Sequence, residues 1–238
     1  MKKIILLVAL IMLTSVSLSR SMADPRGYPS NGKHYLESSS DLSNWGAGGY
    51  FESRDRDVII DHDTLLMGSS EIVGYVSYDV IRWISIYGLA GYAQHDFGEE
   101  GFSSGNSGEY GFGAKFNFFN HEILDPLLLE NRLAINGGLQ YSASTADWNG
   151  EDAQINELAA SLTIGLINDI EGHKLFVPLA IGIFGGGIYS KLFGDIEEAE
   201  ALGATFGLDI YYSEKVTLEV RAEDWVNTTW MGGVHVRC

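Results

Sequence analysis

The sequence predicts an all-β chain that closes into an antiparallel, up-and-down transmembrane β-barrel. Three observations predict this fold. They are an amino-terminal export signal, a series of alternating apolar and polar segments from Trp45 onward, and connections that are mostly short at even-numbered and longer at odd-numbered positions along the chain. The segments number about ten, and each is near or above the 9–11 residues that a tilted strand needs to cross a bilayer. We expect ten strands, with eight as the alternative.

The amino terminus has the features of a cleaved secretory signal peptide. A pair of lysines precedes an apolar run from Ile4, and a small-x-small site ends at Ala23. The apolar run is too short for a membrane-spanning helix, which needs about 20 residues. We therefore expect residues 1–23 to be the signal peptide, residues 24–44 a flexible polar arm, and residues 45–238 the barrel.

The charge and cysteine content exclude two classes of protein. The net charge is −17, and it becomes −17 − 3 = −20 when the three cations of the signal peptide are removed. Nucleic-acid binding needs a basic footprint, which this chain lacks. The single cysteine, Cys238, excludes a disulfide framework within one chain. After the signal, the best candidate for a spanning helix is the stretch 175–189, but Pro178 and three consecutive glycines predict a strand there.

The stretch "KVTLEVRAEDW", residues 215–225, shows why the direction of each face matters. Val216 and Leu218 alternate with polar residues that include Glu219 and Arg221. In a soluble barrel the apolar face packs inside, whereas in a transmembrane barrel it contacts lipid and the charged face lines the lumen. The strand alone fits both cases. The export signal and the connections favour the transmembrane case.

The connections between the predicted strands divide into two sets. The even-numbered ones are mostly tight, as in "NDIEGH" and "SEK", and predict turns on the periplasmic side. The odd-numbered ones are generally longer and acidic, and they predict external loops: "DRDVIIDHDT", "DFGEEGFSSGNSG", "ADWNGEDAQ", "KLFGDIEEAE" and "EDWVNT".

These features together resemble the small outer-membrane β-barrel proteins of Gram-negative bacteria, of which the OmpA-type transmembrane barrel is the best-known form. The resemblance covers residues 45–238 and is one of pattern, without a diagnostic motif. It implies a location in the cell outer membrane, contact with membrane lipid and lipopolysaccharide, insertion by the barrel-assembly machinery, and a monomer.

The last predicted strand, "TWMGGVHVRC", looks like the assembly signal of this class. That signal usually ends in an aromatic residue, whereas this chain ends in a cysteine. One face of the strand carries Trp230, Gly232, Val234, Val236 and Cys238.

Charged residues on the polar faces predict a network inside the lumen. Side chains fill barrels of about eight strands, whereas open pores need about sixteen. A ten-stranded barrel lies near the filled limit, so we expect a largely plugged lumen and not a general diffusion porin. The residues expected to point inward are Glu52, Glu71, Lys115, Arg132, Glu157, Asp209, Glu219, Arg221 and Arg237.

Two histidines raise the hypothesis of a barrel hydrolase. Omptin-type proteases are ten-stranded barrels that place an Asp pair and an Asp–His pair across the external mouth. Here "IIDHDT" contains His62, and His95 precedes Asp96. In an extended segment the aspartates at 61 and 63 share one face while His62 points away, so the tripeptide is no self-contained acid–base pair. We expect no catalytic residues, no metal site and no cofactor.

The function predicted from the sequence is that of a non-enzymatic integral outer-membrane barrel. Its lumen would be charged and largely plugged, and its acidic external loops would serve a structural or surface-interaction role. Three alternatives stay open: an outer-membrane enzyme, either an omptin-like protease or a lipid-modifying barrel, with residues at the external mouth; a narrow channel; and a soluble exported binder of the lipocalin kind.

Overall fold

The computed structural model places one compact unit, Gly32–Cys238, that contains all the residues described below. The predicted signal peptide and arm up to residue 43, together with His62 and Cys238, lie outside the described residues. Within them, no helix has both the length and the apolar character to cross a membrane. The structure describes residues 44–60, 63–81, 83–97, 107–123, 131–148, 151–170, 178–213, 215–225 and 228–237.

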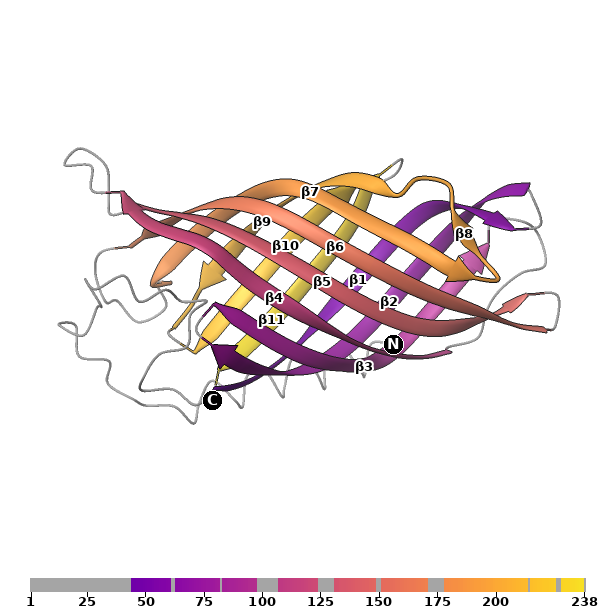
Figure 1. Cartoon of the computed structure of the whole chain (residues 1–238), viewed down its shortest axis with the longest axis horizontal. Coiled ribbons are helices and arrows are strands. Elements are labelled where there is room, and N and C mark those ends of the chain that lie inside the picture. Colours follow the sequence, from indigo (N-terminus) through magenta and orange to yellow (C-terminus); the bar gives the residue numbers. More distant parts are fainter. Residues whose placement is uncertain are drawn as a thin grey trace. The chain divides into compact units, whose positions relative to one another are not determined.

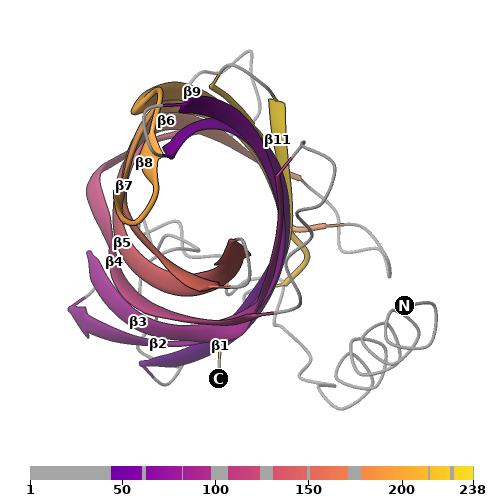
Figure 2. The same ribbon diagram turned by 90° about the vertical axis from the view of Figure 1, so that its right-hand side faces the viewer.

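The described residues form one closed antiparallel barrel, and the prediction of ten strands is confirmed (Figures 1 and 2). Each barrel strand pairs with the next one along the chain, and β11 pairs with β1 to close the ring. The two-residue strand β8 lies outside this ring and pairs with the end of β1. The strands are β1 (Trp45–Ile60), β2 (Asp63–Ile81), β3 (Ile84–Phe97), β4 (Ser107–Ile123), β5 (Asn131–Trp148), β6 (Glu151–Asp169), β7 (Ala180–Gly194), β8 (Glu197–Glu198), β9 (Leu202–Tyr211), β10 (Val216–Asp224) and β11 (Thr228–Arg237).

The barrel has two ends, here called the terminal end and the far end. The terminal end holds the first residue of β1 and the last residue of β11, which lie close together because Gly46 pairs with Arg237. The far end holds the last residue of β1 and the first residue of β2, where Ile60 pairs with Asp63. Figure 2 looks onto the far end and shows β8 at its rim.

The strands continue beyond the predicted segments at the far end, so the predicted sorting of connections by length is wrong. Most of "DRDVIIDHDT" extends β1 and β2, which leaves only residues 61–62 between them. Only residues 149–150 separate β5 from β6, whereas residues 170–179 connect β6 to β7 at the terminal end. The acidic composition of the strand ends resembles that of a loop, although their alternation is that of a strand.

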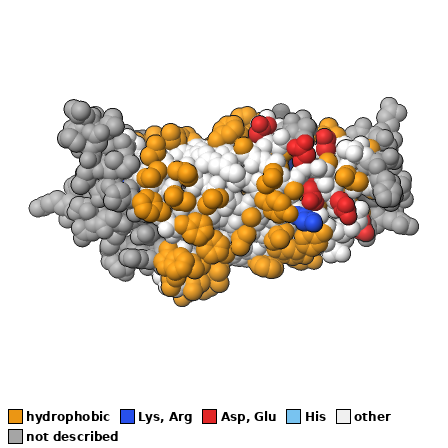
Figure 3. All heavy atoms as spheres, turned by 45° about the horizontal axis from the view of Figure 1, so that its top comes forward, with side chains coloured by type: hydrophobic (Ala, Val, Ile, Leu, Met, Phe, Trp, Pro, Cys, Tyr) orange, Lys and Arg blue, Asp and Glu red, His pale blue; other side chains and the backbone are white. Residues whose placement is uncertain are grey.

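The outer face is apolar over the part of the barrel nearer the terminal end. Ile164 is 57 % exposed there, and Leu162 and Ile183 are exposed as well. In β10, Val220 is exposed on the outer face, while the alternate residue Arg221 lines the interior. Figure 3 shows hydrophobic side chains spread over much of one face of the barrel, with a smaller group of acidic ones beside them. The alternation in β10 fits both a soluble and a transmembrane barrel, and in the structure its apolar face points outward.

The polarity of the two faces is exchanged at the far end. Along β1, Asp55 is exposed on the outer face, whereas Val58 and Ile60 point inward and are buried. In β3, Asp96 is exposed and its neighbour Phe97 is buried. One barrel thus combines an apolar exterior nearer the terminal end with an apolar interior at the far end.

Candidate functional site in the barrel lumen

The nine charged residues expected in the lumen all lie on the inward-facing side of their strands, at three levels. Those near the far end are Glu52, Glu71 and Glu157, those at mid-height are Lys115, Asp209, Glu219 and Arg221, and those near the terminal end are Arg132 and Arg237. Lys115 differs from the rest in remaining exposed although it lines the lumen.

Arg54 forms the main bridge of the level near the far end. Its Nε donates to Glu52 Oε1 at 2.7 Å, within the same strand. Its Nη1 donates to both carboxylate oxygens of Glu157 at 2.9 and 3.0 Å. Because β1 and β6 are not neighbours in the sheet, this pair joins two separate parts of the wall. These bonds join two charged groups, and hydrogen bonds between ionised partners are stronger than those between neutral ones.

Arg56 makes a second connection one layer nearer the far end. Its Nη1 donates to Ser190 Oγ at 2.8 Å, and its Nη2 donates to the carbonyl oxygens of Ser190 and Glu200, each at 3.1 Å. Its guanidinium carbon lies 5.0 Å from the ring centroid of Trp225, within the range of a cation–π interaction. Ser190 Oγ in turn donates to Glu157.

Neither Arg54 nor Arg56 was among the residues predicted for the lumen. Arg56 lies in the stretch that we assigned to an external loop beginning after residue 54, whereas Arg54 is the last residue of the predicted first strand and was not counted among the inward charges. The signal that would have found them is the unbroken alternation of Glu52, Arg54, Arg56 and Val58 with the outward residues of β1.

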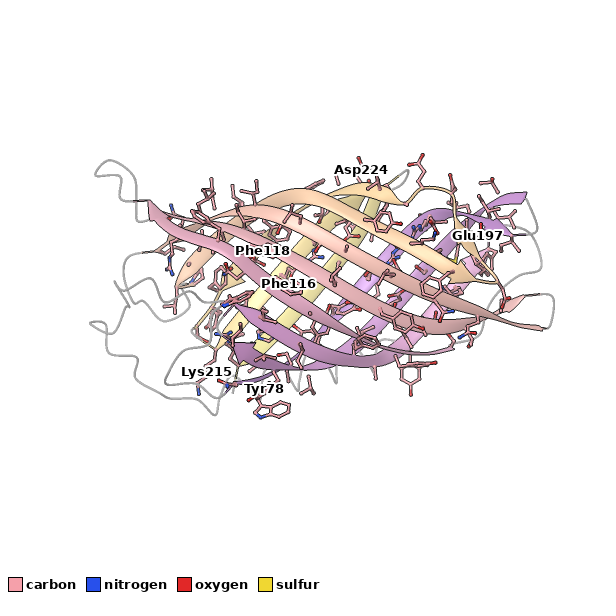
Figure 4. All side chains as sticks on the ribbon, viewed as in Figure 1. Tyr78, Phe116, Phe118, Glu197, Lys215 and Asp224 are labelled. Carbon is pink, nitrogen blue, oxygen red and sulfur yellow. The ribbon has the colours of Figure 1, made fainter. Side chains whose placement is uncertain are left out.

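An apolar cluster closes the lumen at the far end. Residues 195–201, here called the strap, fold against β1, where Val58 pairs with Glu198 of β8. The strap places Ile196 in the interior with 1 % exposure, and Leu192 N donates to Glu198 Oε2 at 2.7 Å. Figure 4 shows Glu197 of the strap at this end. The cluster, here called the seal, consists of Val58, Ile60, Met67, Phe97, Ile155, Leu192 and Ile196.

Below the seal lies a cavity of about 300 Å³. It runs from Asp79 and Arg237 near the terminal end up to Glu157 and Ser190, and no residue of the seal lines it. Arg237 Nη2 donates to Asp79 Oδ2 at 2.8 Å, so an ion pair also lies near the terminal end. The cavity therefore ends at the level of Arg54, Glu157 and Ser190, which line it, whereas Arg56 does not.

The predicted charges at mid-height pair only in part. Arg221 donates to Glu219 within β10 and contacts Glu223 at 3.5 Å. Asp209 lies opposite Glu219 in the register of β9 and β10, and no ion pair joins it to another described residue. Lys115 also lacks an ion pair with any described residue, and its Nζ lies 5.8 Å from the ring centroid of Tyr75.

Aromatic rings in the lumen cover glycines of the neighbouring strand. Tyr75 pairs with Gly48 and Tyr87 pairs with Gly113, and a Cβ added to either glycine would collide with the ring opposite. Tyr87 also donates to Gln140 Oε1 at 2.9 Å. Such cross-strand cover compensates for the missing side chain of a strand glycine. The glycines therefore make room for the rings that wall the cavity.

The histidine considered for catalysis is enclosed inside the barrel. His95 Nε2 lies 3.0 Å from Ser144 Oγ, and both residues are buried. Its neighbour Asp96 is exposed on the outer face, so the two side chains point to opposite sides of the wall. Among the described residues, no group of three or more His, Cys, Asp or Glu has a geometry that could hold a metal ion.

In the last strand, Trp230 is exposed on the outer face, and Gly232, Val234 and Val236 follow it at alternate positions. Whether this face acts as an assembly signal stays a prediction.

No family model and no curated protein matches the chain. Solved structures with a similar arrangement include an outer membrane channel from Pseudomonas putida F1, with a TM-score of 0.46 and 6% identity over 85% of this chain and 98% of that chain. The β domain of the Bordetella autotransporter BrkA gives a TM-score of 0.48 and 10% identity, covering 82% of this chain and 99% of the other. The outer membrane protease OmpT from Escherichia coli gives 0.36 and 10%, covering 86% and 100%. At this level the likeness is one of barrel shape.

Proposed function

We propose that the chain is an integral protein of the cell outer membrane that forms a sealed, non-enzymatic barrel with a structural or surface-interaction role. The observation that carries this proposal is the exchange of polarity along the strands. Side chains such as Ile164 and Val220 give the barrel an apolar exterior, which suits hydrocarbon. Beyond them the exterior also carries exposed acids such as Asp55 and Asp96, which suit water, and the interior holds an apolar cluster.

The orientation follows from the positions of the chain ends. Barrels of this membrane keep both termini on the periplasmic side, so the terminal end would face the periplasm and the far end the outside. Asp55 and Glu197 would then meet the lipopolysaccharide region, where divalent cations link carboxylates to phosphates. We extend the proposal to an OmpA-type monomer whose last strand is read by the barrel-assembly machinery.

The closed lumen supports a role other than diffusion of solutes. A solute would have to pass the Arg54 bridge, the Arg56 layer and the seal in succession. Each of these joins strands on different parts of the wall. The acidic exterior at the far end is then the part of the barrel that is available to the surroundings.

A narrow channel is the second candidate, because the 300 Å³ cavity reaches far into the barrel from the terminal end. Conduction would require the strap to leave the mouth and the Arg56 bonds to break. A membrane enzyme has weaker support, since His95 is buried and separated from Asp96 by the wall of the barrel.

Cell fractionation and conductance recordings test the proposal together. We expect the native chain in the outer-membrane fraction, released only by detergent, and a flat current trace when the purified barrel is inserted into planar bilayers. Recovery from the soluble periplasm would overturn the membrane assignment. Steady single-channel steps would instead favour the narrow channel.

A further inference from the structure

The level of the lumen beneath the seal holds more buried acids than buried bases. Two guanidinium groups, those of Arg54 and Arg56, lie there with five buried or nearly buried carboxylates. Arg54 donates hydrogen bonds to Glu52 and Glu157. A third cation, Arg221, contacts Glu223 at 3.5 Å. The remaining carboxylates are those of Glu71 and Glu109.

The side-chain carboxylates of Glu71 and Glu109 form no hydrogen bond or ion pair with another residue that the structure describes. Glu109 is 5 % exposed, and its Oε2 is a buried oxygen without a partner. A buried carboxylate that stays charged without a partner costs several kcal/mol. The charge of Arg54 acts on both groups, but Arg54 is already paired with Glu52 and Glu157, so a further counter-charge is needed to compensate for Glu71 and Glu109 in full.

The two carboxylates lie on either side of β3, with little between them. Glu71 of β2 pairs with Ala93, and Glu109 of β4 pairs with Gly91. Gly91 and Ala93 are the inward-facing residues of β3 at this level, so no large side chain separates the acids. On its other side Glu71 pairs with Glu52 of β1, whose charge acts on Glu71 more strongly than those of Arg54 and Glu109.

The charge of this pair fits one divalent cation. Hard cations such as Ca²⁺ and Mg²⁺ prefer carboxylate oxygens, and Ca²⁺ accepts irregular geometry. Because the described residues hold no group of three acids or histidines in a metal-binding arrangement, the protein would supply two carboxylates and water the remaining ligands. Two protons would neutralise the pair as well, and the experiment below separates the two cases.

We propose that the lumen binds a divalent, oxygen-liganded cation between Glu71 and Glu109. The ion would link β2 to β4 across the inward face of β3, below the seal. This site is separate from the acidic outer face at the far end, and it does not line the 300 Å³ cavity. It rests on the barrel fold alone, so it stands whether the barrel is sealed or conducting.

The test uses the full barrel, purified in detergent and freed of metal with a chelator. Thermal unfolding is followed while Ca²⁺, Mg²⁺ or Na⁺ is added at constant ionic strength. We expect a saturable rise in melting temperature with Ca²⁺ or Mg²⁺, little response to Na⁺, and about one bound ion per chain by equilibrium dialysis. An unchanged melting temperature with both divalent ions would overturn the proposal.

The variant Glu71→Gln/Glu109→Gln keeps the shape of both side chains and removes both charges. It should be at least as stable as the parent without metal and should show no response to divalent ions. The matched control, Asp55→Asn/Asp57→Asn, removes two outer-face charges and should keep the full response. A response that persists in the glutamine variant and disappears in the control would place the ion outside the lumen. A parent that is stabilised only by lower pH would mean that protons occupy the pair instead.

Discussion

Arg54 donates two hydrogen bonds to Glu157, at 2.9 and 3.0 Å, although the two residues are 103 positions apart in the chain. The pair joins β1 to β6 through the interior, where Arg56 of β1 also lies 3.5 Å from Glu157, although the two strands are not neighbours in the sheet. A barrel held only by its sheet can deform in cross-section. A bridge through its interior resists that deformation, so we expect Arg54 to contribute more to stability than the other lumen cations.

Replacing Arg54 with Met should lower the free energy of unfolding by about 3–5 kcal/mol, because it removes the partner of the buried Glu52 carboxylate and leaves Glu157 with only Arg56, at 3.5 Å, and Ser190. Urea titration of the refolded barrel measures this change. Lys115→Met is the matched control, since Lys115 faces the lumen without an ion pair to a described residue. Equal losses for the two variants would contradict the bridge.

A charge placed on the apolar exterior should also be costly. Ile164 lies in the middle of β6 and is exposed on the outer face. Ile164→Arg should destabilise the membrane-inserted barrel by roughly 2–4 kcal/mol if the side chain lies near the bilayer midplane. Asp55→Arg, on the acidic exterior at the far end, should change stability little. Urea titration in lipid vesicles compares the two variants. An unchanged free energy of unfolding for Ile164→Arg would mean that this surface is not in the membrane.

Opening the far end should turn the closed barrel into a conductor. The variant Arg56→Ala/Ile196→Asp removes the bonds to the strap and places a carboxylate in the seal, where burial of a charge is strongly unfavourable. We expect single-channel steps in planar bilayers for this variant and none for Glu197→Gln, which changes an exposed residue of the same strap. If the double variant gives no single-channel current, the Arg54 layer alone is sufficient to close the lumen.

The glycine beneath Tyr87 should tolerate no side chain. Gly113→Ala would force a methyl group against the Tyr87 ring, so we expect a loss of about 1–3 kcal/mol and a disturbed Tyr87–Gln140 hydrogen bond. Gly88→Ala is the control, because a Cβ at Gly88 meets nothing within 4 Å. Heat-modifiability on gels ranks the two variants against the parent. The cover of glycine by tyrosine would have no energetic role if both behaved alike.

Alternation and the predicted export signal were sufficient to predict the closed barrel of ten strands. The two-residue period of apolar and polar side chains can be recognised within each strand segment by itself. Strand ends were not predictable in the same way. In β1 the sequence keeps alternating past Glu52, but acidic residues on the outer face gave that stretch the composition of a loop. As a result Arg56 and the seal were missed, while Arg54, the last residue of the predicted strand, was not counted among the inward charges.

Which charges meet inside the lumen depends on contacts around the ring, and the order of residues along one strand does not encode them. The sequence predicted Arg221 and Arg132 among the inward-facing charges. In the structure Arg221 bonds to acids of its own strand, whereas Arg54 reaches β6. Register between neighbours follows from alternation, but the pairing of opposite walls requires the three-dimensional barrel.

The exchange of polarity along the strands has a consequence for how deeply the barrel sits. A strand that slid by two residues would keep each side chain on its own face, so alternation alone cannot stop it. In β1 such a slide would carry Asp55 and Asp57 toward hydrocarbon at one level and pull Val58 or Ile60 from its neighbours at another. Both penalties oppose the same displacement, so the boundary between the two patterns fixes the vertical position of each strand against the bilayer surface.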